Sequence, residues 1–152
     1  MSEPAHGRIL ALDLGRRRIG LAVSDELLLT AQGLPTLLRT NAGEDLDRLA
    51  SLAAQWKIAR VLIGNPVHMS GREGAGSAWV REFAEKLERR LGRPVRLWDE
   101  RLTTVQASRV LRESGISRQK RGLAVDRLSA VILLQNYLES SACIQDSGDR
   151  AE

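Results

Sequence analysis

The stretch that decides the fold is residues 8–24, which read Arg-Ile-Leu-Ala-Leu-Asp-Leu-Gly-Arg-Arg-Arg-Ile-Gly-Leu-Ala-Val-Ser. Residues 8–13 form an almost continuous apolar run, which is typical of a strand buried on both faces. Gly15 marks a turn, and residues 18–24 then resume the pattern of a strand. Because the connection is too short for a crossover helix, we expect the two strands to pair as an antiparallel hairpin.

Strand-like and helix-like segments alternate after this hairpin. We expect a third strand within residues 31–39, and short apolar runs predict further strands at residues 60–65 and 95–98. Helical spacing of apolar residues, with capping signals at Asn41 and Gly92, predicts the helices. We expect one helix that begins near Asn41, helices over residues 77–91, 103–113 and 123–138, and a basic connector at residues 117–121.

This order of elements predicts an α/β domain. An antiparallel meander leads into right-handed βαβ crossovers, so the sheet should be mixed. The chain of 152 residues fits a single domain, which we place at residues 8–138. Residues 139–152 are acidic and rich in small polar residues, so we expect a disordered tail there.

Composition restricts the kind of metal site and the compartment. The single cysteine excludes an internal disulfide and a cysteine-cluster zinc site, and the two histidines lie far apart in the sequence. Any metal would therefore have to bind carboxylates. No apolar stretch approaches the roughly 20 residues that a membrane span needs, and we expect a cytoplasmic protein with no membrane partner.

The charge balance favours a polyanionic partner. The chain has 23 Lys and Arg residues against 19 Asp and Glu residues, with a formal net charge of +4 and a pI near 10.0. Four of the acids and only Arg150 lie in residues 139–152, so the remainder of the chain carries a larger basic surplus. Such a surplus favours nucleic acid through counterion release, although an arginine-rich soluble protein is an equal alternative on charge alone.

Carboxylates follow two of the expected buried strands. Asp13 ends the first strand, and Asp99 and Glu100 follow the last one. Asp126 lies in the last expected helix, near its apolar side. Ligand crevices of open α/β sheets lie at the carboxyl ends of the strands, so these acids are candidates for a shared Mg²⁺ or Mn²⁺ site. Such a site supports displacement at phosphorus by activated water. A strand-ending polar residue and a first-turn helix Asp are the structural alternatives.

Several residues near these acids are candidates for binding phosphate. Gly15 would let the backbone approach a phosphate, and arginines, threonines and a lysine could hold its oxygens. These candidates are Gly15, Arg16, Arg17, Arg18, Arg72, Arg101, Thr103, Thr104, Arg118, Lys120 and Arg121. Solvated turn charges and a helix N-cap are the alternatives for several of them.

Aromatic residues make up 3% of the chain. Trp79 and Trp98 lie in apolar patterns, so we place them in the core. Base-stacking platforms need exposed aromatics, so recognition should act on the nucleic-acid backbone rather than on unstacked bases.

Five motifs in order resemble those of the YqgF/RuvX family. The most specific match is Asp99-Glu-Arg-Leu-Thr-Thr104, which is similar to the family's Asp-Glu-Arg-Leu-Thr-Thr segment. The other motifs are residues 9–22, the Gly64-Asn-Pro66 loop continuing to Gly71, residues 117–121 and residues 125–130. The likeness runs from about residue 8 to residue 138.

The resemblance implies a three-layer ribonuclease H-like fold with a five-stranded mixed sheet. It also implies a metal-dependent phosphodiesterase whose ligands are Asp13, Glu100 and Asp126, with Asp99 as a neighbour. The cofactor would be Mg²⁺ or Mn²⁺. This sequence departs from the family pattern at Asn65, His68 and Ser129, and none of these changes removes a carboxylate.

Members of this family are described as candidate pre-16S rRNA nucleases and, by structural analogy, as Holliday junction resolvases. We therefore expect an endonuclease that trims a ribosomal RNA precursor. The alternative is a resolvase of branched DNA, which a stable homodimer would favour because symmetric cutting needs two sites. A non-catalytic RNA-binding module and a phosphate-binding ATPase-like domain are further alternatives, but the chain is short for the latter.

Overall fold

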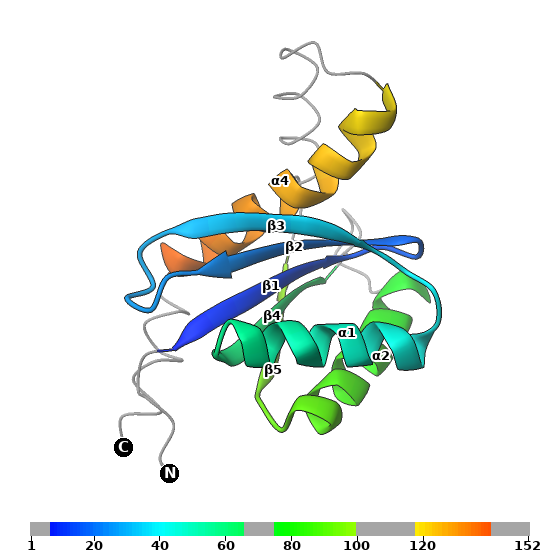
Figure 1. Cartoon of the computed structure of the whole chain (residues 1–152), viewed down its shortest axis with the longest axis horizontal. Coiled ribbons are helices and arrows are strands. Elements are labelled where there is room, and N and C mark those ends of the chain that lie inside the picture. Colours follow the sequence, from blue (N-terminus) through cyan, green and yellow to red (C-terminus); the bar gives the residue numbers. More distant parts are fainter. Residues whose placement is uncertain (1–6, 66–74, 100–117, 141–152) are drawn as a thin grey trace.

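The computed structural model describes residues 7–65, 75–99 and 118–140, with side chains described for residues 7–64, 78–98 and 127–140 (Figure 1). The strands are β1 (Arg8–Leu14), β2 (Arg18–Ser24), β3 (Ala31–Leu38), β4 (Ile58–Asn65) and β5 (Val95–Asp99). The helices are α1 (Ala42–Gln55), α2 (Ala75–Leu91) and α4 (Arg118–Leu138).

The five strands form one mixed sheet in the order β3-β2-β1-β4-β5. Strand β1 pairs antiparallel with β2, and β2 pairs antiparallel with β3, which confirms the predicted hairpin and meander. Strand β1 pairs parallel with β4, and β4 pairs parallel with β5. The carboxyl ends of β1, β4 and β5 therefore share one edge of the sheet, which we call the carboxyl edge.

Helices cover both faces of the sheet. Helices α1 and α2 pack on one face, and α4 crosses the other (Figure 1). Alternate residues of β1 supply both cores: Leu10 and Leu12 face α1 and α2, whereas Ile9 and Ala11 face α4. Leu10, Ala11 and Leu12 are 0% exposed, which confirms the predicted burial of this strand on both faces.

The predicted capping signals are confirmed at two helix ends. Asn41 is the N-cap of α1, and its side chain accepts a hydrogen bond from the Glu44 backbone N–H at 3.0 Å. Gly92 follows α2 with a φ of +64°, and its N–H donates to the Glu88 carbonyl at 2.9 Å. These local signals fix where each helix begins or ends relative to the sheet.

The expected start of α4 was wrong. The helix begins at Arg118, so residues 118–121 are its first turn and not a connector. Arginine, glutamine and lysine are good helix formers, which accounts for the longer helix. The residues that helical spacing predicts to face inward, which are Leu123, Ala124, Leu128, Val131, Leu134 and Leu138, are confirmed in part, since Leu134 is buried and Val131 and Leu138 pack against the core. Leu128, Val131 and Leu138 are only partly buried, and the buried row is Ser129, Ala130, Leu133, Leu134 and Tyr137.

Tyr137 helps to select this row, because its ring meets Trp98 edge-on at a centroid distance of 5.3 Å. Around Arg127, α4 lies close against β3. A Cβ at Gly33 would lie 2.6 Å from Arg127 Cγ, and Arg127 Nε donates to the Leu34 carbonyl at 3.1 Å. These contacts fix α4 over the sheet face that Ile9 and Ala11 share.

Arg39 joins the β1–β2 turn to both helices of the opposite layer. Its Nη1 donates to the Gly15 carbonyl at 3.0 Å, and its Nε lies 2.9 Å from Asp45 Oδ2 on α1. The guanidinium lies 5.4 Å from the Trp79 ring centroid and 5.2 Å from that of Phe83, both on α2. The Asp45 side chain is 1% exposed, so this ion pair is largely withdrawn from water.

Replacing Ser129 by Ala should stabilise the fold. The Ser129 hydroxyl is buried and has no hydrogen-bond partner among the described residues. Removing it should raise the free energy of unfolding by about 1 kcal/mol, because an unpaired buried hydroxyl is costly. Ser24→Ala is the matched control, since the Ser24 hydroxyl accepts from the Ile9 N–H at 2.8 Å, and it should destabilise. Urea unfolding of both variants checks this, and a loss of stability in Ser129→Ala would contradict it.

Replacing Arg39 by Ala should destabilise the fold by about 3 kcal/mol, because the buried Asp45 carboxylate loses its cation. Arg48→Ala is the control, since Arg48 makes an exposed bond to the Leu38 carbonyl, and it should cost less than about 0.5 kcal/mol. Thermal and urea unfolding measure both values. Equal stability of the two variants would show that the Arg39–Asp45 pair does not contribute to the free energy of unfolding.

Candidate functional site

Asp13 lies at the carboxyl edge, at the end of the central strand. On one side, Asp13 pairs with Gly20 of β2. On the other side, Leu12 pairs with Ile63 of β4, so the β4 residue next to Asp13 is Gly64. Both glycines are buried and carry no side chain. On both neighbouring strands, the position across from the partly exposed Asp13 is therefore a glycine.

Asp13 shares the α4 face of the sheet. Residues two apart on a strand point to the same face, and Ile9 and Ala11 pack against α4. On β5, Trp98 packs against the same core as Ile9 and Ala11, whereas Leu97 packs against the core on the opposite face. The α4 face at the carboxyl edge therefore carries Asp13 and Trp98, with the glycine of β4 between them.

The structure places the other predicted metal ligands only in part. Asp126 belongs to the N-terminal half of α4, which lies toward the side where β1 ends (Figure 1), but its side chain is outside the described residues. In the sequence, position 126 precedes the buried Ala130 by four residues and the buried Leu133 by seven. Glu100 is outside the described residues, one position after the end of β5. Among the side chains that are described, no three metal-binding groups converge.

The predicted phosphate-binding residues divide into two sets. Gly15, Arg16, Arg17 and Arg18 lie in or beside the β1–β2 turn and are described. Arg118, Lys120 and Arg121 lie in the first turn of α4, with side chains outside the description. Arg72, Arg101, Thr103 and Thr104 lie outside the described residues altogether.

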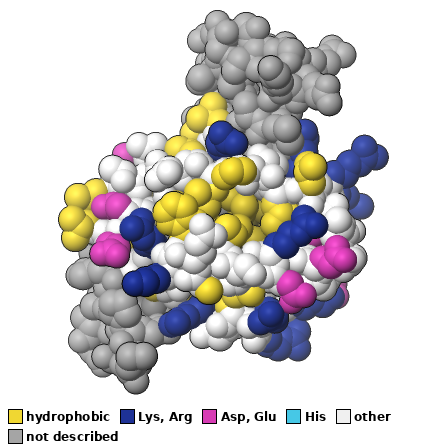
Figure 2. Space-filling model, viewed as in Figure 1, with side chains coloured by type: hydrophobic (Ala, Val, Ile, Leu, Met, Phe, Trp, Pro, Cys, Tyr) yellow, Lys and Arg dark blue, Asp and Glu magenta, His cyan; other side chains and the backbone are white. Residues whose placement is uncertain are grey.

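The β1–β2 turn is tight, and Gly15 is required for it. The Gly15 N–H donates to the Arg18 carbonyl at 2.9 Å, and a Cβ at Gly15 would lie 2.7 Å from that oxygen. The turn projects Arg16 and Arg17 into solvent. Basic side chains gather on the right of the view in Figure 2, at the end of the molecule where this turn lies.

A cleft of about 850 Å³ opens beside the turn, on the α1 and α2 side of the sheet. We call it the arginine cleft, and it is lined by Arg16, Arg17, Leu38, Arg39, Thr40, Asn41, Ala42, Asp45 and Trp79. A second hollow of about 610 Å³ shares Arg16, Arg17 and Leu38 with the cleft and extends along the turn to Arg18.

Sequence reasoning missed Arg39, Asp45 and Trp79 as residues of this region. Trp79 was expected in the core, and it does pack against it, but the same side chain also lines the cleft. An acidic residue in a first helical turn signals an ordinary dipole contact, so nothing in the pattern around Asp45 indicated its partner. A tryptophan near the start of an arginine-rich helix was the one available signal for Trp79.

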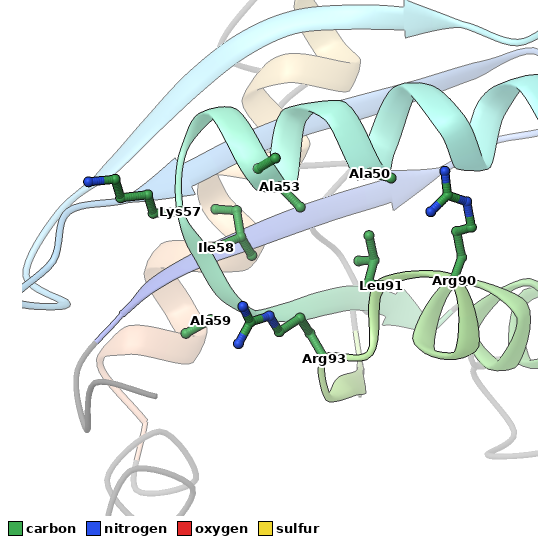
Figure 3. Close-up of a pocket in the computed structure, with 9 residues that line it drawn as sticks. Ala50, Ala53, Lys57, Ile58, Ala59, Arg90, Leu91 and Arg93 are labelled. Carbon is green, nitrogen blue, oxygen red and sulfur yellow. The ribbon is translucent and has the colours of Figure 1, made fainter. Parts of the chain in front are cut away.

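Another pocket lies at the opposite edge of the sheet (Figure 3). Its volume is about 480 Å³, and it is lined by Ala50, Ala53, Ala54, Lys57, Ile58, Ala59, Arg90, Leu91 and Arg93. The C-terminal ends of α1 and α2 meet here, and helix C-termini attract cations. The basic side chains of this pocket thus lie near helix C-termini, and Asp13 is not among the residues that line it.

No helix in the described ranges is long and apolar enough to cross a membrane.

A family model described as "RuvX: Holliday junction resolvase" matches residues 7–140. A protein of Koribacter versatilis named "Putative pre-16S rRNA nuclease" is 56% identical over 141 residues, which cover 91% of this chain and 92% of that protein. A protein of Myxococcus xanthus with the same name is 44% identical over 133 residues, covering 88% of each chain. The chain therefore spans nearly the whole length of these relatives.

Solved structures share the fold. The RuvC protein of T. thermophilus, solved with a Holliday junction substrate, matches with a TM-score of 0.55 and 16% identity, over 90% of this chain and 96% of that chain. The Fowlpox virus resolvase, solved with Holliday junction DNA, matches with a TM-score of 0.56 and 14% identity, over 88% and 98%. The expected ribonuclease H-like fold is confirmed, and because the family model matches residues 7–140 of the 152, this protein belongs to the RuvX family.

Proposed function

We propose that this protein is a metal-dependent endonuclease that processes the end of pre-16S ribosomal RNA. The observation that carries the proposal is the placement of Asp13, a carboxylate at the end of the buried central strand with a glycine on each side. The names of the two relatives, which are 56% and 44% identical over nearly their whole length, support the RNA substrate.

Asp13 stands at the end of a buried strand, next to an apolar layer. Three residues that precede it on β1 are 0% exposed, so the carboxylate stands at the mouth of an apolar layer. A cation or a phosphate-bound cation at this position would stabilise the ionised form. The absence of side chains on Gly20 and Gly64 would favour binding of such a ligand on the α4 face.

Strand alternation favours Glu100 over Asp99 as the second acid. Trp98 lies on the face of Asp13, and Leu97 lies on the other face. If the alternation of β5 continues for one more residue, Glu100 follows Trp98 onto the face of Asp13, and Asp99 follows Leu97 away from it. The family resemblance selects the same residue.

Helical periodicity supports Asp126 as the third acid. The row of α4 that packs on the sheet includes Ala130, Leu133 and Tyr137, and Asp126 precedes Ala130 by four residues. This row faces the side of the sheet that carries Asp13. Asp126 would therefore be the third acid of the set, contributed by the helix that covers this face of the sheet.

An all-carboxylate set suits Mg²⁺ or Mn²⁺, which prefer oxygen ligands. A cation bound by Asp13, Glu100 and Asp126 would lower the pKa of a water molecule and offset negative charge on the phosphate. The side chains of the protein would position the cation and the substrate. The Asp13 carboxylate would orient the ligand at the strand end, and the arginines of the β1–β2 turn would hold flanking phosphates.

A Holliday junction resolvase is the second candidate function. The description of the matching family model favours it, and so do the folds of two structures solved with junction DNA. Cleavage of a pre-16S rRNA fragment, a four-way DNA junction and a plain duplex by one preparation separates the two functions. Symmetric cutting of the junction by a stable homodimer would establish the resolvase.

Cleavage of the pre-16S fragment should require Mg²⁺ or Mn²⁺ and should stop in excess chelator, because every candidate ligand is a carboxylate. Asp13→Asn should lose activity by at least about a hundredfold at saturating metal, in line with the loss of one charge from a metal site. Circular dichroism should show that this variant keeps its fold. Full activity in chelator would rule out the metal mechanism.

Glu100→Gln should lose cleavage by about the same factor as Asp13→Asn, because both remove a charged ligand from one face of the sheet. Asp99→Asn is the matched control, since it changes the adjacent carboxylate in the same way, and it should keep most of the activity. Rates are measured at saturating metal on variants whose folding has been confirmed. A dead Asp99→Asn beside an active Glu100→Gln would reverse the assignment.

A further inference from the structure

We propose that the arginine cleft binds an unpaired nucleotide of the RNA strand beside the cleavage site. Arg16 and Arg17 would hold its phosphate, and its base would stack on Trp79. The proposal rests on the nuclease function and adds a substrate class to it, namely RNA that is single-stranded next to the scissile bond.

The cleft has the size and position for this role. Its volume of about 850 Å³ lies in the range of small-molecule sites, which extends from about 300 to about 1,000 Å³. It begins at the turn that directly follows β1, so that Arg16 is only three residues from Asp13. A strand with one phosphate at Asp13 would meet this turn with a neighbouring phosphate.

Three arginines line the cleft, and Arg39 is bonded to other parts of the fold whereas Arg16 and Arg17 are exposed. Arg39 is held by Asp45 and by the Gly15 carbonyl, and its side chain is 14% exposed. Arg16 and Arg17 are exposed, and neither forms an ion pair with any described residue. The one acid that lines the cleft, Asp45, is already paired with Arg39, so Arg16 and Arg17 give the cleft a net positive charge.

Trp79 offers the cleft an aromatic surface of fixed orientation. Its ring packs against the core, and the held guanidinium of Arg39 lies 5.4 Å from the ring centroid. The exposed guanidinium of Arg16 lies 5.9 Å from the same centroid. A base stacked on an indole is worth more than an exposed cation–π contact, so a base can replace Arg16 on the ring. Arg16 is then released to the phosphate of that nucleotide.

The pocket at the opposite edge of the sheet is the natural comparison, because Lys57, Arg90 and Arg93 make it basic as well. It lacks an aromatic side chain, and it lies where two helix C-termini disfavour anions. Figure 3 shows Lys57 extending away from Arg90 and Arg93, so these cations do not converge on one point. Substitutions there remove charge without touching the arginine cleft.

The test measures binding in chelator, where no cleavage occurs, so its result is independent of the metal mechanism. The probes are a labelled single-stranded RNA of about eight nucleotides, within the site sizes of such proteins, and a blunt RNA duplex. Trp79→Leu should weaken binding of the single strand about tenfold and leave the duplex within about twofold. Trp79→Phe should restore the affinity, because phenylalanine also stacks.

The phosphate contacts are tested by salt dependence. Arg16→Ala with Arg17→Ala should reduce the slope of log affinity against log salt by about 1.4, or about 0.7 for each phosphate contact on a single strand. Lys57→Gln with Arg93→Gln is the charge-matched control, and it should leave the slope unchanged. Each variant's melting temperature is measured first, so that unfolding is not mistaken for lost binding.

Fluorescence gives a readout that a structural role of Trp79 would not produce. Stacking of a base should quench indole emission in the wild type, and Trp79→Phe should remove this quenching while it keeps the affinity. Wild-type affinity in a folded Trp79→Leu, or equal losses for single strand and duplex, would overturn the proposal. An inactive nuclease that still shows the Trp79-dependent binding would instead count against the proposed function alone.

Discussion

The burial of β1 on both faces is the constraint on which the other features depend. Leu10, Ala11 and Leu12 have no exposed surface, so the chain must supply a helical layer on each side. A charged side chain cannot be accommodated within such a strand without a partner, but it can stand at the end. Asp13 takes that position, and the sheet order brings the end of β4 beside it and the end of β5 one strand further along the same edge. Burial of the strand and placement of the acid therefore have one cause.

Arg39 makes the same edge rigid on the other side of the sheet. Two backbone hydrogen bonds hold the β1–β2 turn, one from the Gly15 N–H to the Arg18 carbonyl and one from the Arg39 N–H to the Arg17 carbonyl, both at 2.9 Å. Arg39 links the turn to α1 through Asp45 and to α2 through Trp79 and Phe83. A planar guanidinium can donate in two directions and stack at the same time, which an ammonium cannot do. The residue thus fixes the turn that follows the candidate catalytic strand.

Local patterns in the sequence were enough to predict the strands and two helix ends, because apolar runs, Asn41 and Gly92 act through neighbouring residues. The start of α4 was predicted wrongly, and its buried row was predicted only in part. The row depends on Tyr137 meeting Trp98, which is far away in the sequence. The Arg39–Asp45 pair and the double role of Trp79 also depend on tertiary contacts. Asp13 was predicted and placed at the edge, whereas the roles of Glu100 and Asp126 rest on periodicity and family resemblance.

Asp13 and the arginine cleft lie on opposite faces of the sheet, and this limits the shape of a substrate that contacts both. Asp13 lies on the α4 face, whereas the arginine cleft lies on the face of α1 and α2. Only the β1–β2 turn separates them, so a nucleic-acid chain that contacts both must bend sharply around the edge of one sheet. A stiff duplex bends this sharply only at a high cost, whereas unpaired nucleotides rotate freely about their backbone bonds. The topology of the sheet therefore favours cleavage next to an unpaired segment.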